Sequence, residues 1–110
     1  MNAQHQQLAA GRWMQLSFVE QMANIGSEVE RALNWRAQEN SAYFQKAADR
    51  ALELMDLTLD SVKEYTRLRE IARVRETFVD YFFGANEHGS TDALWRKYFF
   101  WFTYAARKNA

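Results

Sequence analysis

The feature that most constrains this chain is an apolar repeat of helical period. Its first part follows intervals of four and three residues, through Phe18, Met22, Ile25, Val29, Ala32 and Arg36. Residues at these intervals share one face of an α-helix. The chain has no Pro and only 4 Gly among 110 residues, too few for a turn-rich β fold. The sequence therefore predicts an all-α protein.

Interruptions of the repeat divide it into four predicted helices. The first is long, over residues 12–38, and passes through Gly26, at a cost of roughly 1 kcal/mol relative to Ala. The second covers residues 42–59, after Asn40 or Ser41 as its N-terminal cap.

The third helix is predicted to begin at Ser61, which makes the pattern of a capping box with Glu64. It is expected to end at Gly84 in the left-handed conformation. After the loop GANEHGST, Ser90 or Thr91 is expected to cap the last helix.

Four amphipathic helices with short connections pack as antiparallel neighbours. We therefore expect one domain over residues 1–110, an up-down-up-down antiparallel four-helix bundle whose long first helix overhangs its neighbours. Residues 1–11 are expected to form a flexible polar tail. This N-terminus lacks the apolar centre of a signal peptide, and no apolar run approaches the ~20 residues of a membrane span. We expect a cytoplasmic protein with no membrane partner.

The last helix is rich in aromatic residues and has two faces. The face expected to meet the core carries Leu94, Trp95, Tyr98, Trp101, Phe102, Ala105 and Ala106, with Phe99 at its edge. Phe100 and Tyr104 lie one turn apart on the other side, beside Arg96 and Arg107. Aromatic residues and Arg are enriched at interface centres, so these four residues predict a self-association surface. The alternatives are incidental exposure, cover by the first helix, and a nucleic-acid surface.

A second candidate site centres on Arg75. The predicted core seam of the third helix is Tyr65, Leu68, Ala72, Arg75, Val79 and Phe82. A guanidinium in this seam must be paired or stacked, because burying it alone is costly. Trp35 is expected beside it, with Glu76, Asp80 or Glu39 as the carboxylate partner. The group is interpreted either as a structural buried arginine or as a binding site for phosphate or carboxylate.

Charged residues of the second and third helices predict a ladder of ion pairs. If the helices fold back at residues 60–61, Asp49 lies level with Arg73, and Glu53 lies level with Arg69. Arg67 and Arg73, together with Arg96 and Arg107, are also the candidates for binding nucleic acid. The whole chain carries 14 basic and 14 acidic residues, so it has no overall attraction to nucleic acid.

Catalytic and metal-binding patterns are few. The chain has no Cys, and its only histidines are His5 and His88. No Glu-x-x-His pair and no Gly-rich phosphate loop occurs. His88 beside Glu87 is a weak candidate for acid–base chemistry, and a solvated loop is the simpler interpretation. We expect no metal and no cofactor.

Three segments, NIGSEVERAL, RALELMDLTLD and LREIARVRETFVDYFFGANEHGSTD, resemble a set of small bacterial helical proteins with no assigned activity. The resemblance covers residues 24–107 and implies a bacterial helical protein without implying any chemistry. In architecture the predicted bundle resembles HEPN bundles, which include toxin ribonucleases, and S23-type bundles. Active HEPN ribonucleases carry an arginine a few residues before a histidine. The nearest arginine before His88 is Arg75, which argues against RNA cleavage of this kind.

The sequence as a whole indicates a non-enzymatic helical interaction or assembly module. We expect a homo-oligomer, a dimer or larger, that associates through the last helix, with a protein partner as a further candidate. An accessory nucleic-acid-binding bundle is the alternative, and a ribonuclease is the weakest hypothesis.

Overall fold

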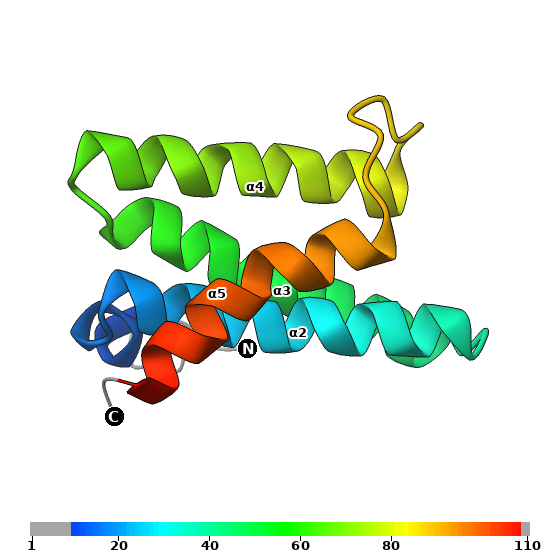
Figure 1. The fold of residues 1–110 in the computed structure, drawn as a ribbon, viewed down its shortest axis with the longest axis horizontal. Helices are drawn as coiled ribbons and strands as arrows, with labels where there is room; N and C mark the ends of the chain where they lie inside the picture. The colour runs from blue at the N-terminus through cyan, green and yellow to red at the C-terminus, as the bar shows by residue number, and fades with distance from the viewer. Residues whose placement is uncertain (1–9, 109–110) are drawn as a thin grey trace.

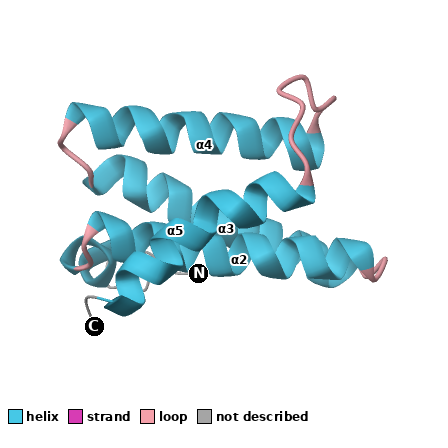
Figure 2. Cartoon of the chain, in the orientation of Figure 1, coloured by secondary structure: helices cyan, strands magenta, loops and turns pink. Residues whose placement is uncertain are grey.

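The computed structural model describes residues 10–108, and all regular structure in this range is helical (Figures 1 and 2). A helical segment over residues 10–15 is followed by four longer helices: α2 (Phe18–Ala37), α3 (Ser41–Ser61), α4 (Tyr65–Phe83) and α5 (Asp92–Lys108). The predicted all-α fold is confirmed. None of these helices is long and apolar enough to cross a membrane.

The prediction of one long first helix is wrong, because the helix is interrupted at residues 16–17. Ser17 is the N-cap of α2 in an extended conformation. Its hydroxyl accepts a hydrogen bond from the Glu20 backbone N–H, and the Glu20 carboxylate accepts one from the Ser17 N–H, each at 3.1 Å. This capping box satisfies two backbone donors at once and starts a new helix where the apolar repeat alone runs on.

The break allows the segment over residues 10–15 to pack against the core. Trp13 is buried, and its Nε1 donates a hydrogen bond of 2.8 Å to the hydroxyl of Thr58 in α3. The side chain of Gln21 donates to the Trp13 carbonyl oxygen at 2.9 Å. Residues 10 and 11, which were predicted to belong to a flexible tail, are part of this segment, and the rest of that predicted tail lies outside the described residues.

The connection between α3 and α4 lies further along the chain than predicted. Asn40 caps α3 as expected, since its side chain accepts from the Tyr43 N–H at 3.0 Å. Ser61 is the last residue of α3, and its hydroxyl donates to the Thr58 carbonyl oxygen instead of capping α4. Glu64 precedes α4 without a side-chain cap, so the predicted capping box at residues 61–64 is wrong.

The buried face of α4 differs from the predicted seam. The buried residues are Ile71, Val74 and Phe78, whereas Tyr65 and Ala72 are exposed. The buried side chains are wholly apolar, whereas the predicted seam would have buried the guanidinium of Arg75 and the phenol of Tyr65, which are costly to take out of water. Arg75 lies beside this face instead of within it. Gly84 ends the helix with φ −117°, so its predicted left-handed conformation is also wrong.

The core-facing side of α5 is only partly as predicted. Thr91 caps the helix, accepting from the Leu94 N–H at 3.1 Å, and Trp95 and Phe99 are buried. Leu94 and Trp101, which were expected in the core, are 56% and 65% exposed. Both lie on a side of α5 that no neighbouring helix covers.

The packing of the helices explains this exposure. In Figure 1 α2, α3 and α4 run alternately in opposite directions, and α5 crosses α2 obliquely. α2 packs closely against both α3 and α5, and α4 packs less extensively against α3. Among the described helices, α4 and α5 make no comparably close contact. The arrangement therefore lacks the tight pairing of its last two helices that a regular bundle would have.

The crossing of α2 and α5 depends on Gly26. A Cβ atom at this position would lie 2.8 Å from the Phe99 Cβ, closer than such atoms approach in proteins. Since the Phe99 Cβ is fixed to the backbone of α5, the side chain cannot rotate away. Gly26, which the sequence marks only as a weak point of a helix, is thus the residue that lets α5 approach α2.

We expect Gly26→Ala to lower the free energy of unfolding by up to about 2 kcal/mol. Overpacking costs roughly 1–3 kcal/mol and outweighs the gain of about 1 kcal/mol in helix propensity. Urea unfolding followed by circular dichroism measures the difference. Gly11→Ala is the matched control, because Gly11 is also helical and a Cβ there would meet nothing within 4 Å. This control should be neutral or stabilising, and an equal effect of the two substitutions would contradict the assigned role of Gly26.

Candidate functional site

Three aromatic side chains on the outer side of α5 form an exposed cluster, the α5 aromatic patch. Phe100, Trp101 and Tyr104 are 61%, 65% and 53% exposed. The rings of Phe100 and Tyr104 are stacked, with centroids 6.3 Å apart and planes inclined by 23°. The Trp101 ring meets Phe100 edge-on at 6.0 Å. Contiguous apolar surface of this kind marks a binding surface more often than scattered exposed residues do.

A groove of about 570 Å³ runs between α2 and α5 beside this patch. All four residues predicted for self-association, Phe100, Tyr104, Arg96 and Arg107, line it. Its lining includes Gly26 and Phe99, which pack directly against one another at the helix crossing. The structure thus joins the predicted interface residues into one depression with an aromatic edge.

Arg96 fixes one edge of the groove. Its Nε donates to both carboxylate oxygens of Glu30 at 3.0 and 3.1 Å, and its Nη2 donates to the Asn34 side-chain oxygen at 3.2 Å. These bonds join α5 to α2 and hold the Arg96 side chain in place. Arg107, near the other end of α5, has no carboxylate within 4.0 Å among the described residues.

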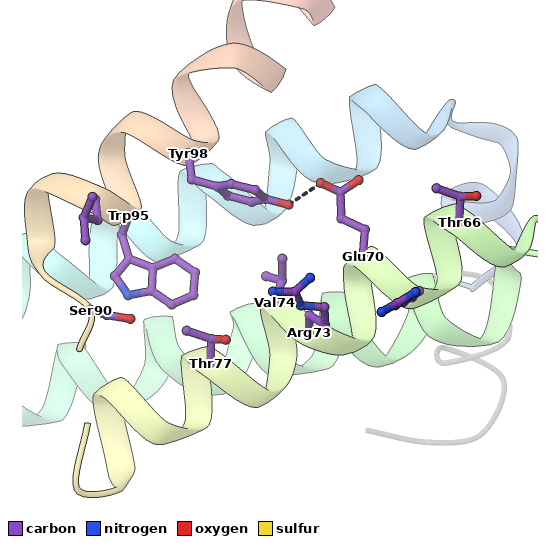
Figure 3. Close-up of a pocket in the computed structure, with 10 residues that line it drawn as sticks. Thr66, Glu70, Arg73, Val74, Thr77, Ser90, Trp95 and Tyr98 are labelled. Carbon is purple, nitrogen blue, oxygen red and sulfur yellow. Dashed lines mark hydrogen bonds between the residues drawn. The ribbon is translucent and has the colours of Figure 1, made fainter. Parts of the chain in front are cut away.

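A second depression, the α4–α5 cleft, opens on the other side of α5 with a volume of about 730 Å³ (Figure 3). Figure 3 shows Trp95 and Tyr98 of α5 facing Glu70, Arg73 and Thr77 of α4 across it. The cleft exists because the backbones of α4 and α5 do not pack closely. The sequence did not predict this site, because the residues of α4 that face α5 depend on how α4 is oriented in the fold.

The Tyr98 phenol bridges the cleft by donating to the Glu70 carboxylate at 2.7 Å. Burial raises the pKa of Tyr98 well above its usual range, and the hydrogen bond to Glu70 raises it further. Tyr98 therefore stays protonated and remains a donor. Arg69 and Arg73 also line the cleft, and neither guanidinium has a carboxylate within 4.0 Å among residues 10–108.

The start of α5 is held by a polar cluster at the end of the molecule. The Asp92 carboxylate accepts from Arg36 Nη2 at 3.0 Å and from the Tyr81 hydroxyl. The Arg36 guanidinium lies 4.6 Å from the ring centroids of both Tyr81 and Phe82. Burial, followed by the hydrogen bond to Asp92, raises the pKa of Tyr81. Arg36, which the sequence places in the core seam of the first helix, thus combines an ion pair with contacts to two aromatic rings.

The candidate site predicted around Arg75 does not assemble. Arg75 is part-exposed, and its Nε donates to Asp56 of α3 at 2.6 Å. Trp35 packs instead on Tyr43, with ring centroids 4.8 Å apart. Arg75 therefore joins α3 to α4 as a structural residue.

Two of the three predicted carboxylate partners of Arg75, Asp80 and Glu76, serve the loop after α4, and the third, Glu39, does not pair with Arg75 either. The backbone N–H groups of His88 and Glu87 donate to Asp80 at 3.0 and 2.7 Å, and the His88 bond is the main cause that lowers the pKa of Asp80. Glu76 lies 3.8 Å from His88 Nε2. His5 lies outside the described residues, and no group of three or more metal-ligating side chains occurs among those that are described.

The arginines predicted to bind nucleic acid do not share a surface. Arg67 pairs with Glu64 at 3.2 Å and lies over the Phe18 ring at 5.5 Å. Arg73 lines the α4–α5 cleft, whereas Arg96 and Arg107 line the α2–α5 groove. The predicted pairs Asp49–Arg73 and Glu53–Arg69 also do not form, because the connection after α3 lies beyond residues 60–61 and shifts the register of α4.

We expect the free energy of unfolding to fall as the pH rises above about 10, the ordinary pKa of tyrosine. The unfolded chain then loses phenolic protons that Tyr98 keeps in the folded state, so the stabilisation present below that pH is lost. Tyr98→Phe should reduce the steepness of this fall, although Tyr81 still contributes to it. Urea unfolding between neutral pH and about pH 11 measures both proteins. An unchanged pH dependence in the variant would contradict the assigned state of Tyr98.

Comparison of the chain with family models, with curated proteins and with solved structures finds no match. The geometry of α5 and of the two depressions beside it therefore carries the functional argument alone.

Proposed function

We propose that this protein is a non-enzymatic helical interaction module that self-associates through the α5 aromatic patch and the adjoining α2–α5 groove. The single observation that carries the proposal is that two exposed rings of the patch, Phe100 and Tyr104, line a groove of about 570 Å³. In water these rings cost free energy, which a partner would recover by covering them.

A second copy of the chain is the partner that this surface fits. In a twofold contact the same surface occurs on both subunits. The aromatic patch of each copy can therefore enter the α2–α5 groove of the other copy. The α2 edge of the groove contributes the carboxylate of Glu30, and the α5 edge contributes the guanidinium of Arg107. Glu30 already pairs with Arg96 of its own chain, so a twofold contact that brings Arg107 of one copy to Glu30 of the other would extend this pair into a cluster of charges.

The proposal also covers the helix topology, and the cellular location and source are considered with it. We regard the four long helices as an up-down-up-down bundle that is opened between α4 and α5, with the dimer contact on the opposite side of α5. The cytoplasmic location and the bacterial source stay predictions.

Nucleic-acid binding has weaker support. The arginines proposed for it lie in separate places, and Arg67 and Arg96 already pair with carboxylates. A ribonuclease that uses His88 has still less support. The carboxylate near the His88 ring belongs to Glu76 and not to the predicted Glu87, and the side chains of His88 and Glu76 are both exposed.

We expect the protein to be a discrete dimer or larger oligomer and Phe100→Asp to be a monomer. The substitution removes a ring that the interface would cover and puts in its place a carboxylate, which is costly to desolvate. Light scattering coupled to gel filtration, over a wide range of concentrations, measures the mass. Far-ultraviolet circular dichroism and thermal unfolding should be almost unchanged by the substitution, because Phe100 packs little against its own chain.

Tyr65→Asp is the matched control, since Tyr65 is also an exposed ring but lies at the start of α4. It should leave the mass unaltered. A wild-type monomer at all concentrations would refute self-association, and an oligomeric Phe100→Asp variant would refute the assigned surface. Excess absorbance at 260 nm in the eluted peak would favour the nucleic-acid alternative.

A further inference from the structure

We propose that the α4–α5 cleft binds a small organic monoanion, a carboxylate attached to a flat apolar body that ends in a hydrogen-bond acceptor. This site lies on the other side of α5 from the proposed dimer contact, and it goes beyond the proposed function.

The charged residues that line the α4–α5 cleft favour an anionic ligand. The lining holds two guanidinium groups, Arg69 and Arg73, against the single carboxylate of Glu70. Glu70 already accepts the phenolic hydrogen of Tyr98, whereas neither arginine has a carboxylate partner among the described residues. The cleft therefore has one net positive charge and free guanidinium donors, which a carboxylate matches in charge and in planar geometry.

The middle of the cleft selects a flat apolar body. Val74 and Thr77 of α4 face Trp95 of α5 across it (Figure 3), and Leu94 adds exposed apolar surface to the lining. A volume of about 730 Å³ is within the range of small-molecule sites. An aliphatic or aromatic ring placed between these side chains would remove apolar surface of both helices from water.

The far end of the cleft holds an unsatisfied donor. Trp95 is 5% exposed, and its Nε1 is buried without a hydrogen-bond partner among the described residues. Figure 3 shows the edge of the indole that carries this nitrogen turned toward Ser90. A buried donor without a partner is costly, and an acceptor atom that met Nε1 as the Trp95 ring turned toward the cleft would remove the cost. A ligand with a carboxylate near the arginines and an oxygen near Trp95 satisfies both ends.

Three naphthalene compounds test these features separately. The probe 6-hydroxy-2-naphthoate carries both the carboxylate and the far oxygen, 2-naphthoate lacks the oxygen, and 2-naphthol lacks the carboxylate. Isothermal titration calorimetry on the full chain measures their binding. We expect 6-hydroxy-2-naphthoate to bind most tightly and 2-naphthol to bind about tenfold or more weakly, because a hydrogen bond to a charged group is lost.

Matched variants assign the binding to the cleft. Arg73→Gln should weaken 6-hydroxy-2-naphthoate about tenfold and leave 2-naphthol unchanged. Trp95→Phe keeps a ring but removes the N–H, so it should abolish the preference for 6-hydroxy-2-naphthoate over 2-naphthoate. Arg67→Gln is the control, since Arg67 is on the same helix but pairs with Glu64 outside the cleft, and it should bind all three probes as the wild type does.

Absence of binding by any probe, equal affinity for 2-naphthol and the acids, or unchanged affinity in Arg73→Gln would each overturn the proposal. The dimer variant Phe100→Asp should bind the probes like the wild type. Loss of binding in that variant would show that the anion site needs the oligomer, and would overturn the assignment to a cleft within one chain. The two proposals can therefore fail independently.

Discussion

The close approach of α5 to α2 at Gly26 is the contact on which the arrangement of the molecule depends. Because no side chain separates the two helices there, Phe99 lies directly against the α2 backbone. The polar cluster around Asp92 then holds the start of α5 against α2 and α4. With its position fixed by α2, α5 cannot also pack closely along α4. The cleft between α4 and α5 and the exposure of Trp101 both follow from the close packing of α5 on α2 instead of on α4.

α5 consequently separates two surfaces with different chemistry. On one side, the aromatic patch and the groove offer apolar surface together with charges of both signs, as a contact between protein chains requires. On the other side, the cleft offers two arginines without partners, a protonated tyrosine and a buried indole N–H, which suit a small anion. Trp95 lines both depressions. Movement of the Trp95 ring would therefore change the shape of both depressions.

Three ion pairs among the described residues link one helix to another. Arg96 joins α5 to α2 through Glu30, Arg75 joins α4 to α3 through Asp56, and Arg36 joins α2 to α5 through Asp92. Exposed pairs of this kind contribute only about 0–1 kcal/mol each. Their main effect is to select one register among helices whose apolar faces would tolerate several.

The sequence alone determined the helical class and the core face of α2, and it narrowed the cap of α3 to Asn40 or Ser41 and that of α5 to Ser90 or Thr91, because each follows from the spacing of residues within one helix. The exposed pair Phe100 and Tyr104 was predictable for the same reason. Only the tertiary structure decided that Ser17 and not Ser61 forms a capping box, that Arg75 pairs with Asp56, and that Trp101 faces outward. The α4–α5 cleft belongs to this second group. Local spacing fixes which side chains share a face of a helix, but which face is covered depends on how closely two backbones approach, and here a glycine and the phenylalanine packed on it set that distance.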